Sequence, residues 1–210
     1  MNSVVDGDSY VQKVYTNFFK ISLYLFPVLS LFMAANQTGS DRERGTLRFI
    51  TLHTSRDAIF FARFLSQVII HYVFIIFSLL STLIAGFYQQ FFILADAMEL
   101  VMQSVAVVGN LALIVLPFIA LMALLSAVLK SPRQVTFYAG VIWSLAMLVI
   151  NVISHYLPAA QALNILVPGM QFSALSALSG MALFSLAYIP LVQCGLLLLA
   201  GREIMRRQAL

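Results

Sequence analysis

The chain has 210 residues, of which 61% are hydrophobic and only 10% are charged, and its formal net charge is +4. A soluble domain typically has about 25% charged residues, so this composition excludes a soluble protein and predicts an integral membrane protein. The run from Gln134 to Gly201 contains no Asp, Glu, Lys or Arg and is long enough for two spans of about 20 residues each. Membrane orientation and contact with anionic lipid headgroups already explain the basic residues, so we expect membrane lipids, and no nucleic acid, as partners.

The fold class follows from the requirement that backbone groups in lipid satisfy one another. Length and composition favour helices over a barrel, whose strands would alternate polar and apolar residues. We therefore predict an all-α integral membrane protein with one domain over residues 1–210, a bundle of five transmembrane helices. The predicted spans are about 18–35, 59–87, 100–129, 135–156 and 177–200.

The first apolar stretch is short for a span and contains Pro27, but Lys20 can extend its charged end to the interface. The acidic start of the chain lacks a basic region, so we expect no cleaved signal peptide. A polar segment, 37–58, follows the first span. Ser40 is a suitable N-cap and Glu43 completes a capping box, which predicts a short helix in this segment.

The segment between the fourth and fifth spans is apolar but interrupted by Pro158, Pro168 and Gly169. It is too apolar for a solvated loop and too broken for a span. Short interfacial or re-entrant helices, lying on the outer face, fit this pattern best.

Lys and Arg residues fall into alternate polar segments. Five lie between the first span and the first turns of the second, at 42–63, two between the third and fourth, and three at the end of the chain, whereas 87–100 and 156–176 contain none. Because cationic loops stay in the cytoplasm, residues 37–63, 129–134 and the C-terminus should lie inside. The N-terminus should then lie outside.

Several kinds of chemistry are not expected from this sequence. The Gly39–Thr46 run lacks the lysine of a phosphate-binding loop, so the chain should not hydrolyse nucleotide itself. No pair of carboxylates lies inside a span, which argues against a proton-coupled carrier. The single Cys194 can form neither an intrachain disulfide nor a metal cluster. We expect no enzyme activity, metal or cofactor in this chain.

Polar residues also occur at membrane depth. Gln67 and His71 are four residues apart and share one helical face. One hypothesis is a candidate substrate path, formed by Gln67, His71, Asn110 and Asn151. The alternative, which we favour for any single residue, is hydrogen bonding between helices, at about 1 kcal/mol for each side chain.

The segment from Ser40 to Ile50, with Leu52–Arg56 and Ala62–Leu65, resembles the signature of the type-2 ABC transporter permease family. The family pattern has two acids before Gly-Thr-Leu, then Leu-Pro-x-Ser-Arg, then Gly-Lys-Phe-Leu. The matching residues are Asp41, Glu43, Gly45, Thr46, Leu47, Ser55 and Arg56. The departures are His53 in place of proline and Ala62-Arg63 in place of Gly-Lys.

The resemblance implies the membrane-spanning subunit of an ABC exporter in a bacterial inner membrane. Its partners would be a separate ATPase, in two copies that bind ATP and Mg²⁺, and a second permease half, identical or different. A cytoplasmic coupling helix in loop 37–58 would contact the ATPase. The predicted contact residues are Asp41, Glu43, Arg44, Gly45, Thr46, Leu47 and Arg56. Members of the family usually have six spans, so the sixth is lost, lies upstream or comes from another chain.

Two other functions compete with this one. The first is a non-transporting membrane scaffold or assembly factor, for example in the maturation of an envelope metalloprotein or haem protein. The second is a channel or carrier that does not need ATP. An accompanying ATPase would separate the transporter subunit from both.

Overall fold

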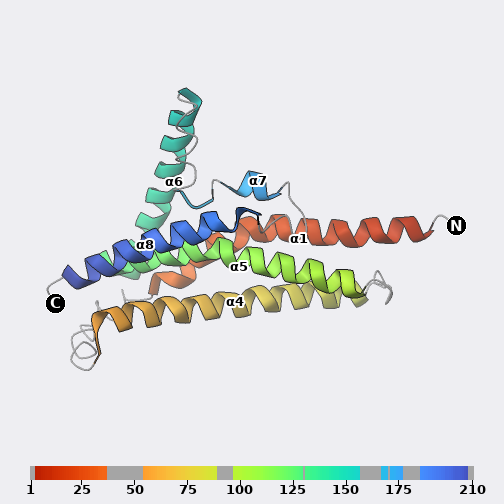
Figure 1. Ribbon diagram of the computed structural model, residues 1–210, viewed down its shortest axis with the longest axis horizontal. Coiled ribbons are helices and arrows are strands. Elements are labelled where there is room, and N and C mark those ends of the chain that lie inside the picture. Colours follow the sequence, from red (N-terminus) through yellow and green to blue (C-terminus); the bar gives the residue numbers. More distant parts are fainter. Residues whose placement is uncertain are drawn as a thin grey trace.

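The computed structural model describes residues 3–36, 54–88, 97–129, 131–156, 167–169, 171–176 and 185–207, and every regular element in them is a helix (Figure 1). The elements are α1 (Ser3–Met33), the 3₁₀ turn η1 (Ala34–Asn36), α4 (Arg56–Tyr88), α5 (Ala97–Val128), α6 (Pro132–Tyr156), α7 (Phe172–Ser176) and α8 (Tyr188–Arg207). Five of these helices are long and apolar enough to cross a membrane: α1, α4, α5, α6 and α8. This confirms the prediction of an all-α membrane protein with five spans.

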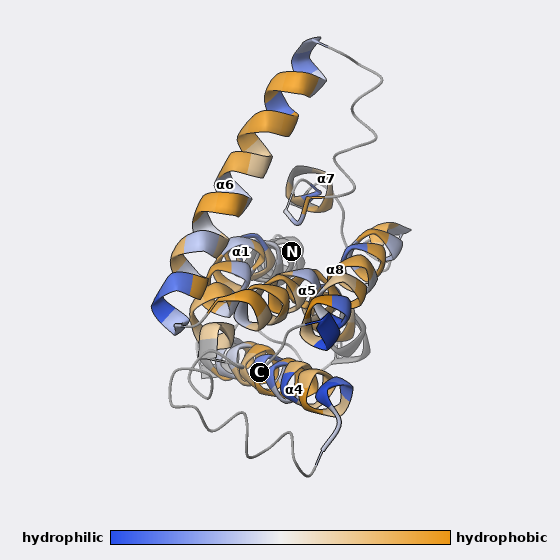
Figure 2. Ribbon diagram, turned by 90° about the vertical axis from the view of Figure 1, so that its left-hand side faces the viewer, coloured by the Kyte–Doolittle hydropathy of each residue, from blue (hydrophilic) through white to orange (hydrophobic). Residues whose placement is uncertain are grey.

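Helix α5 is the centre of the bundle. It is apolar on all sides, as expected of a helix that other helices surround, and 72% of its span is buried. Leu111, Val115, Phe118 and Met122 are fully enclosed. Helices α1, α4 and α8 pack against it, and Figure 2 shows α5 between α4 on one side and α1 and α8 on the other. The bundle is therefore organised around one helix.

Small residues let α8 approach α5 and α4 near the C-terminal end of α8. Ala123 and Ala127 of α5 belong to a buried cluster with Phe60 of α4 and Met205 of α8. Gly201 of α8 lies where an added Cβ would be 2.7 Å from the Phe60 ring and 3.3 Å from the Leu124 Cα. Close approach of this kind at small residues is a common way to pack helices in lipid.

Helix α6 leaves the bundle at an angle (Figure 1), and only Val135 and Ala139 at its start are buried. Its middle is attached through Trp143, whose Nε1 donates a 2.7 Å hydrogen bond to the Pro168 carbonyl. The Trp143 ring also packs edge-on against Phe118 of α5. This contact holds the segment before α7 against α5 and α6.

That segment and α7 lie in the charge-free stretch between the last two spans, as expected for short, broken helices there. Gly169 has φ +98°, a left-handed conformation that glycine adopts without strain, and Trp143 and Met147 lie within 3.4 Å of the position of an added Cβ. Phe172 of α7 then stacks on Phe118. The turn at Gly169 therefore directs α7 back onto the bundle.

Some helices are longer or shifted relative to the predicted spans. Helix α1 begins at Ser3, whereas the apolar stretch begins at about Phe18, and α8 begins at Tyr188 and continues to Arg207. Hydropathy detects only the part of a helix that lipid can cover, so polar turns at either end escape it. Pro190 fits in the first turn of α8 because its missing N–H would have no partner there. The predicted coupling helix lies outside the described residues.

We predict that Gly201→Ala destabilises the protein by about 1–3 kcal/mol, because Phe60 is buried and the Leu124 backbone cannot easily move away. Thermal unfolding in detergent measures the effect. Gly195→Ala, on the same helix, is the matched control, since its added Cβ meets nothing within 4 Å and alanine favours the helix by up to about 1 kcal/mol. Equal stability of the two variants would contradict the close packing at Gly201.

Candidate functional site at the start of helix α4

Of the predicted ATPase-contact residues, Arg56 is the one that the structure describes, and it is the first residue of α4. The others lie outside the described residues: Asp41, Glu43, Arg44, Gly45, Thr46 and Leu47. The structure therefore shows the end of the predicted coupling loop, where the chain enters the bundle at the start of α4.

The start of α4 is fixed by local hydrogen bonding. The Ser55 hydroxyl accepts a 3.3 Å hydrogen bond from the Ala58 amide, as an N-cap residue does. Asp57 lies in the first turn, where a negative charge interacts favourably with the helix dipole. A capped first turn makes the entry from the loop into the span a defined, rigid joint.

Asp57 also joins this first turn to the end of α8. Its carboxylate accepts hydrogen bonds from Arg202 Nε at 2.9 Å and from Arg206 Nη2 at 2.6 Å. Arg206 Nε is a further donor to the same carboxylate, at 3.0 Å from Oδ1. Arg56 Nη1 reaches the Arg206 carbonyl at 3.4 Å. We call these four residues the ion-pair cluster.

The ion-pair cluster lies at the end of the bundle where α4 begins and α8 ends (Figure 1). Directly beneath it is the apolar cluster that includes Ile59 and Phe60 of α4, Ala123 of α5 and Met205 of α8. Polar contacts at the surface and apolar packing one turn deeper thus connect α4 to α8.

The sequence did not identify Asp57, Arg202 or Arg206 as site residues, because orientation alone accounts for charges near the end of a span. One signal was present. Arg202 and Arg206 are four residues apart and therefore lie on one face of a helix, where both can reach a single acid. Which acid they would meet depends on the packing of α8 beside α4.

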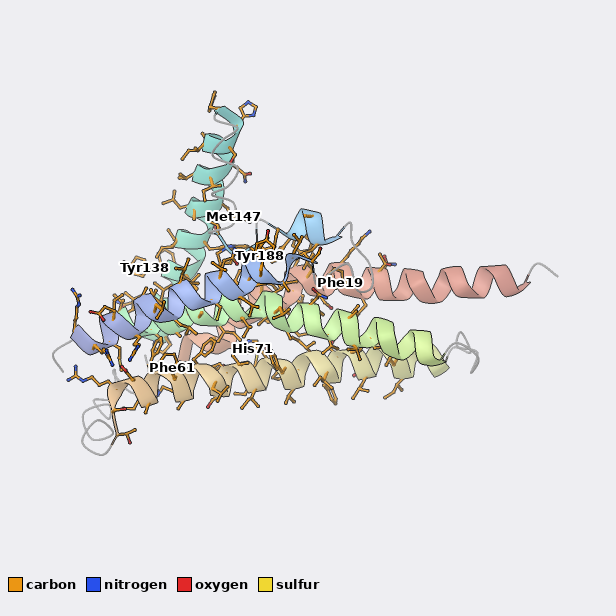
Figure 3. The ribbon with its side chains drawn as sticks, viewed as in Figure 1. Phe19, Phe61, His71, Tyr138, Met147 and Tyr188 are labelled. Carbon is orange, nitrogen blue, oxygen red and sulfur yellow. The ribbon has the colours of Figure 1, made fainter. Side chains whose placement is uncertain are left out.

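The residues of the candidate substrate path lie in two environments. His71 and Asn110 are buried, at 1% and 2% exposure, and Figure 3 shows His71 between α4 and α5. The Asn110 amide donates a 2.8 Å hydrogen bond to the Ala106 carbonyl of its own helix. Asn151 is exposed on α6, towards the end that points away from the bundle (Figure 1). The fold thus places Gln67, His71 and Asn110 on central helices and leaves Asn151 apart.

Several described hydroxyl side chains in the spans bond to their own helix. The Ser66, Ser81, Thr82, Ser126 and Thr136 hydroxyls donate to carbonyls three or four residues earlier, at 2.8–3.2 Å. Such bonds satisfy a polar side chain without a second helix. The hydroxyls of these residues therefore need no partner on a neighbouring helix.

We predict that Asp57→Ala and Arg206→Ala each lower the unfolding temperature, and that the double variant is no less stable than the worse single one, because both remove the same interaction. The effect should shrink in high salt, which screens exposed charges. Thermal unfolding at two salt concentrations measures both. Arg207→Ala is the control, since Arg207 pairs with Glu203 within α8. Additive losses for Asp57 and Arg206 would contradict the pairing.

A family model described as "ABC-2 family transporter protein" matches residues 3–201. Comparison with curated proteins gave no match. The matched region includes all five apolar helices, although it ends before the last turn of α8 and so before Arg202 and Arg206. With its five membrane-spanning helices and a match over nearly its whole length, the chain belongs to the ABC-2 type transporter permease family.

Proposed function

We propose that this membrane permease of an ABC transporter is an exporter subunit of a bacterial inner membrane, driven by a separate ATPase through the loop before α4. Membership of the family implies an ATPase partner and a membrane-embedded assembly. The observation that carries the proposal is the connection from the first turn of α4 to α8, made by Asp57, Arg202 and Arg206.

The ATPase must convert closure on nucleotide into movement of the spans. Two ATPase copies that bind ATP and Mg²⁺ would close together and displace the loop 37–58 on each of two permease halves. Loop residues such as Glu43 and Arg44 would form the polar contact, as a helix in a groove of the partner. The displacement would then reach α4 at Arg56, and pass through the ion-pair cluster to α8.

This pathway explains why a rigid joint is useful at the start of α4. A flexible joint would absorb the movement of the loop, whereas the Ser55 cap and the buried Phe60 hold the first turn of α4 in place. The Gly201 contact holds α8 against the same turn. We infer that α4 and α8 move together during transport.

The orientation of the chain is the first test. In a Cys194→Ser background, Thr54→Cys should react with a membrane-impermeant maleimide only after spheroplasts are permeabilised, because the positive-inside rule places this loop in the cytoplasm. Thr54 is exposed at the start of α4, and Tyr156 is exposed at the far end of α6. Tyr156→Cys should react in intact spheroplasts. Labelling of Thr54→Cys from outside would rule out the proposed coupling.

The second test removes the loop charges. Glu43→Ala combined with Arg44→Ala should abolish co-purification of the ATPase and ATP-dependent transport, because the polar contact is lost. Arg133→Ala is the control, since this exposed residue at the start of α6 is basic but belongs to another loop. Wild-type transport in the double variant would overturn the proposal. Purification of the wild-type chain with no Walker-motif ATPase would favour a scaffold or an ATP-independent carrier instead.

A further inference from the structure

Gln67 and His71, one turn apart on α4, are exceptions to the local bonding of polar side chains. The His71 Nδ1 lies 2.7 Å from the Gln67 carbonyl oxygen. A carbonyl can only accept a hydrogen bond, so Nδ1 must carry the proton and donate. In the neutral ring the other nitrogen, Nε2, is then a bare acceptor.

Two acceptors are buried without a donor in this turn. Neither His71 Nε2 nor Gln67 Oε1 has a hydrogen-bond partner in the part of the chain that the structure describes, and both atoms are inaccessible to solvent. Their neighbours along α4, Val68 and Ile75, are buried apolar residues. A buried acceptor without a donor costs free energy, and a charged imidazolium in such surroundings would cost more. The turn therefore contains two buried acceptors whose lack of a donor is energetically unfavourable.

The position of this turn is set by contacts on either side. Towards the cytoplasmic end, Phe60 packs on Gly201 of α8. On the other side, Ile75 is fully buried in the main apolar cluster, together with Leu111 and Val115 of α5. Gln67 and His71 lie between these two contacts, and Figure 3 shows His71 between α4 and α5. The ion-pair cluster joins the start of the same helix to α8.

We propose that Gln67 and His71 form a binding site for the hydroxyl or neutral primary amine group of an amphiphilic cargo, whose alkyl chain lies along the apolar residues of the spans. A neutral amine has two N–H donors and can donate to both acceptors, whereas a hydroxyl has one O–H and donates to one of them at a time. That the bound molecule is a cargo rests on the proposed transport function, whereas binding itself is a property of this chain. Binding requires α4 to move away from α5 at this turn, the movement that the ATPase would drive.

The first experiment uses the full-length chain in lipid nanodiscs and measures thermal unfolding with three probes, a C12 primary amine, a C12 alcohol and the C12 methyl ether. The amine and the alcohol should raise the unfolding temperature and the ether, which cannot donate, should not. His71→Leu should raise the apparent dissociation constant of both donors at least tenfold. Equal stabilisation by the ether, or an unchanged response in His71→Leu, would overturn the proposal.

Two further variants separate binding from folding. Without probe, His71→Leu should be at least as stable as the wild type, because a buried acceptor has been removed. Loss of probe binding without loss of thermal stability is not expected of a residue with a purely structural role. His71→Gln, which restores an acceptor, should recover part of the response. Ile75→Leu, one turn further along α4 and fully buried, is the matched control and should respond like the wild type.

Water is another possible donor, and a labelling experiment distinguishes it. In a Cys194→Ser background, Gln67→Cys should react with a small methanethiosulfonate reagent, and the C12 alcohol should protect it. Reaction without protection would mean that the turn holds water only, and would overturn the proposal.

None of these measurements involves the ATPase, so a failure of ATPase co-purification would reject the transport function and leave the binding result to be judged alone.

Discussion

The structure depends on one constraint, that the other helices pack around α5, which is apolar over most of its circumference. Residues such as Leu111, Phe118 and Met122 are fully buried because α1, α4 and α8 pack around them. In lipid the favourable free energy of helix association comes from close packing rather than from removal of water, so the shape of the contacts matters more than their hydrophobicity. The arrangement of the other helices follows from the need to fit α5.

This constraint has its clearest consequence at the end of the bundle where α4 begins. Ala123 and Ala127 make α5 narrow there, and Gly201 does the same for α8, so α8 comes close enough to α4 for Arg202 and Arg206 to reach Asp57. Exposed ion pairs contribute little to stability on their own. Placed over a tightly packed apolar layer, they instead fix which turn of α8 faces which turn of α4.

The same packing accounts for the contrast between the two kinds of polar residue in the spans. Ser66 and Thr82 bond back to their own helices and place no demand on their neighbours. His71 uses one nitrogen in this way and buries the other with the Gln67 side-chain oxygen. The ion-pair cluster and the buried pair of acceptors therefore both lie on α4, the first beside α8 and the second beside α5. The movement proposed at the first turn of α4 would open the site further along the same helix.

The sequence by itself determined the class of the protein. Low charge and five apolar stretches favour helices, which satisfy the backbone hydrogen bonds in lipid. The Gly45-Thr46-Leu47 motif with its flanking acids indicated the family, and the family model that matches residues 3–201 then confirmed it. The broken stretch around Pro168 was also predictable, because proline and glycine interrupt helices locally. These properties depend on composition and on residues close together in the chain.

The tertiary structure decided which distant residues meet. No local pattern relates Asp57 to Arg206, Trp143 to the Pro168 carbonyl or Phe60 to Gly201, because each of these contacts depends on how whole helices pack. Hydropathy likewise could not show that α6 leaves the bundle, since a helix facing lipid and one facing protein can be equally apolar. Each helix is determined by residues that are close together in the sequence, whereas the packing of side chains around α5 determines which helices lie side by side.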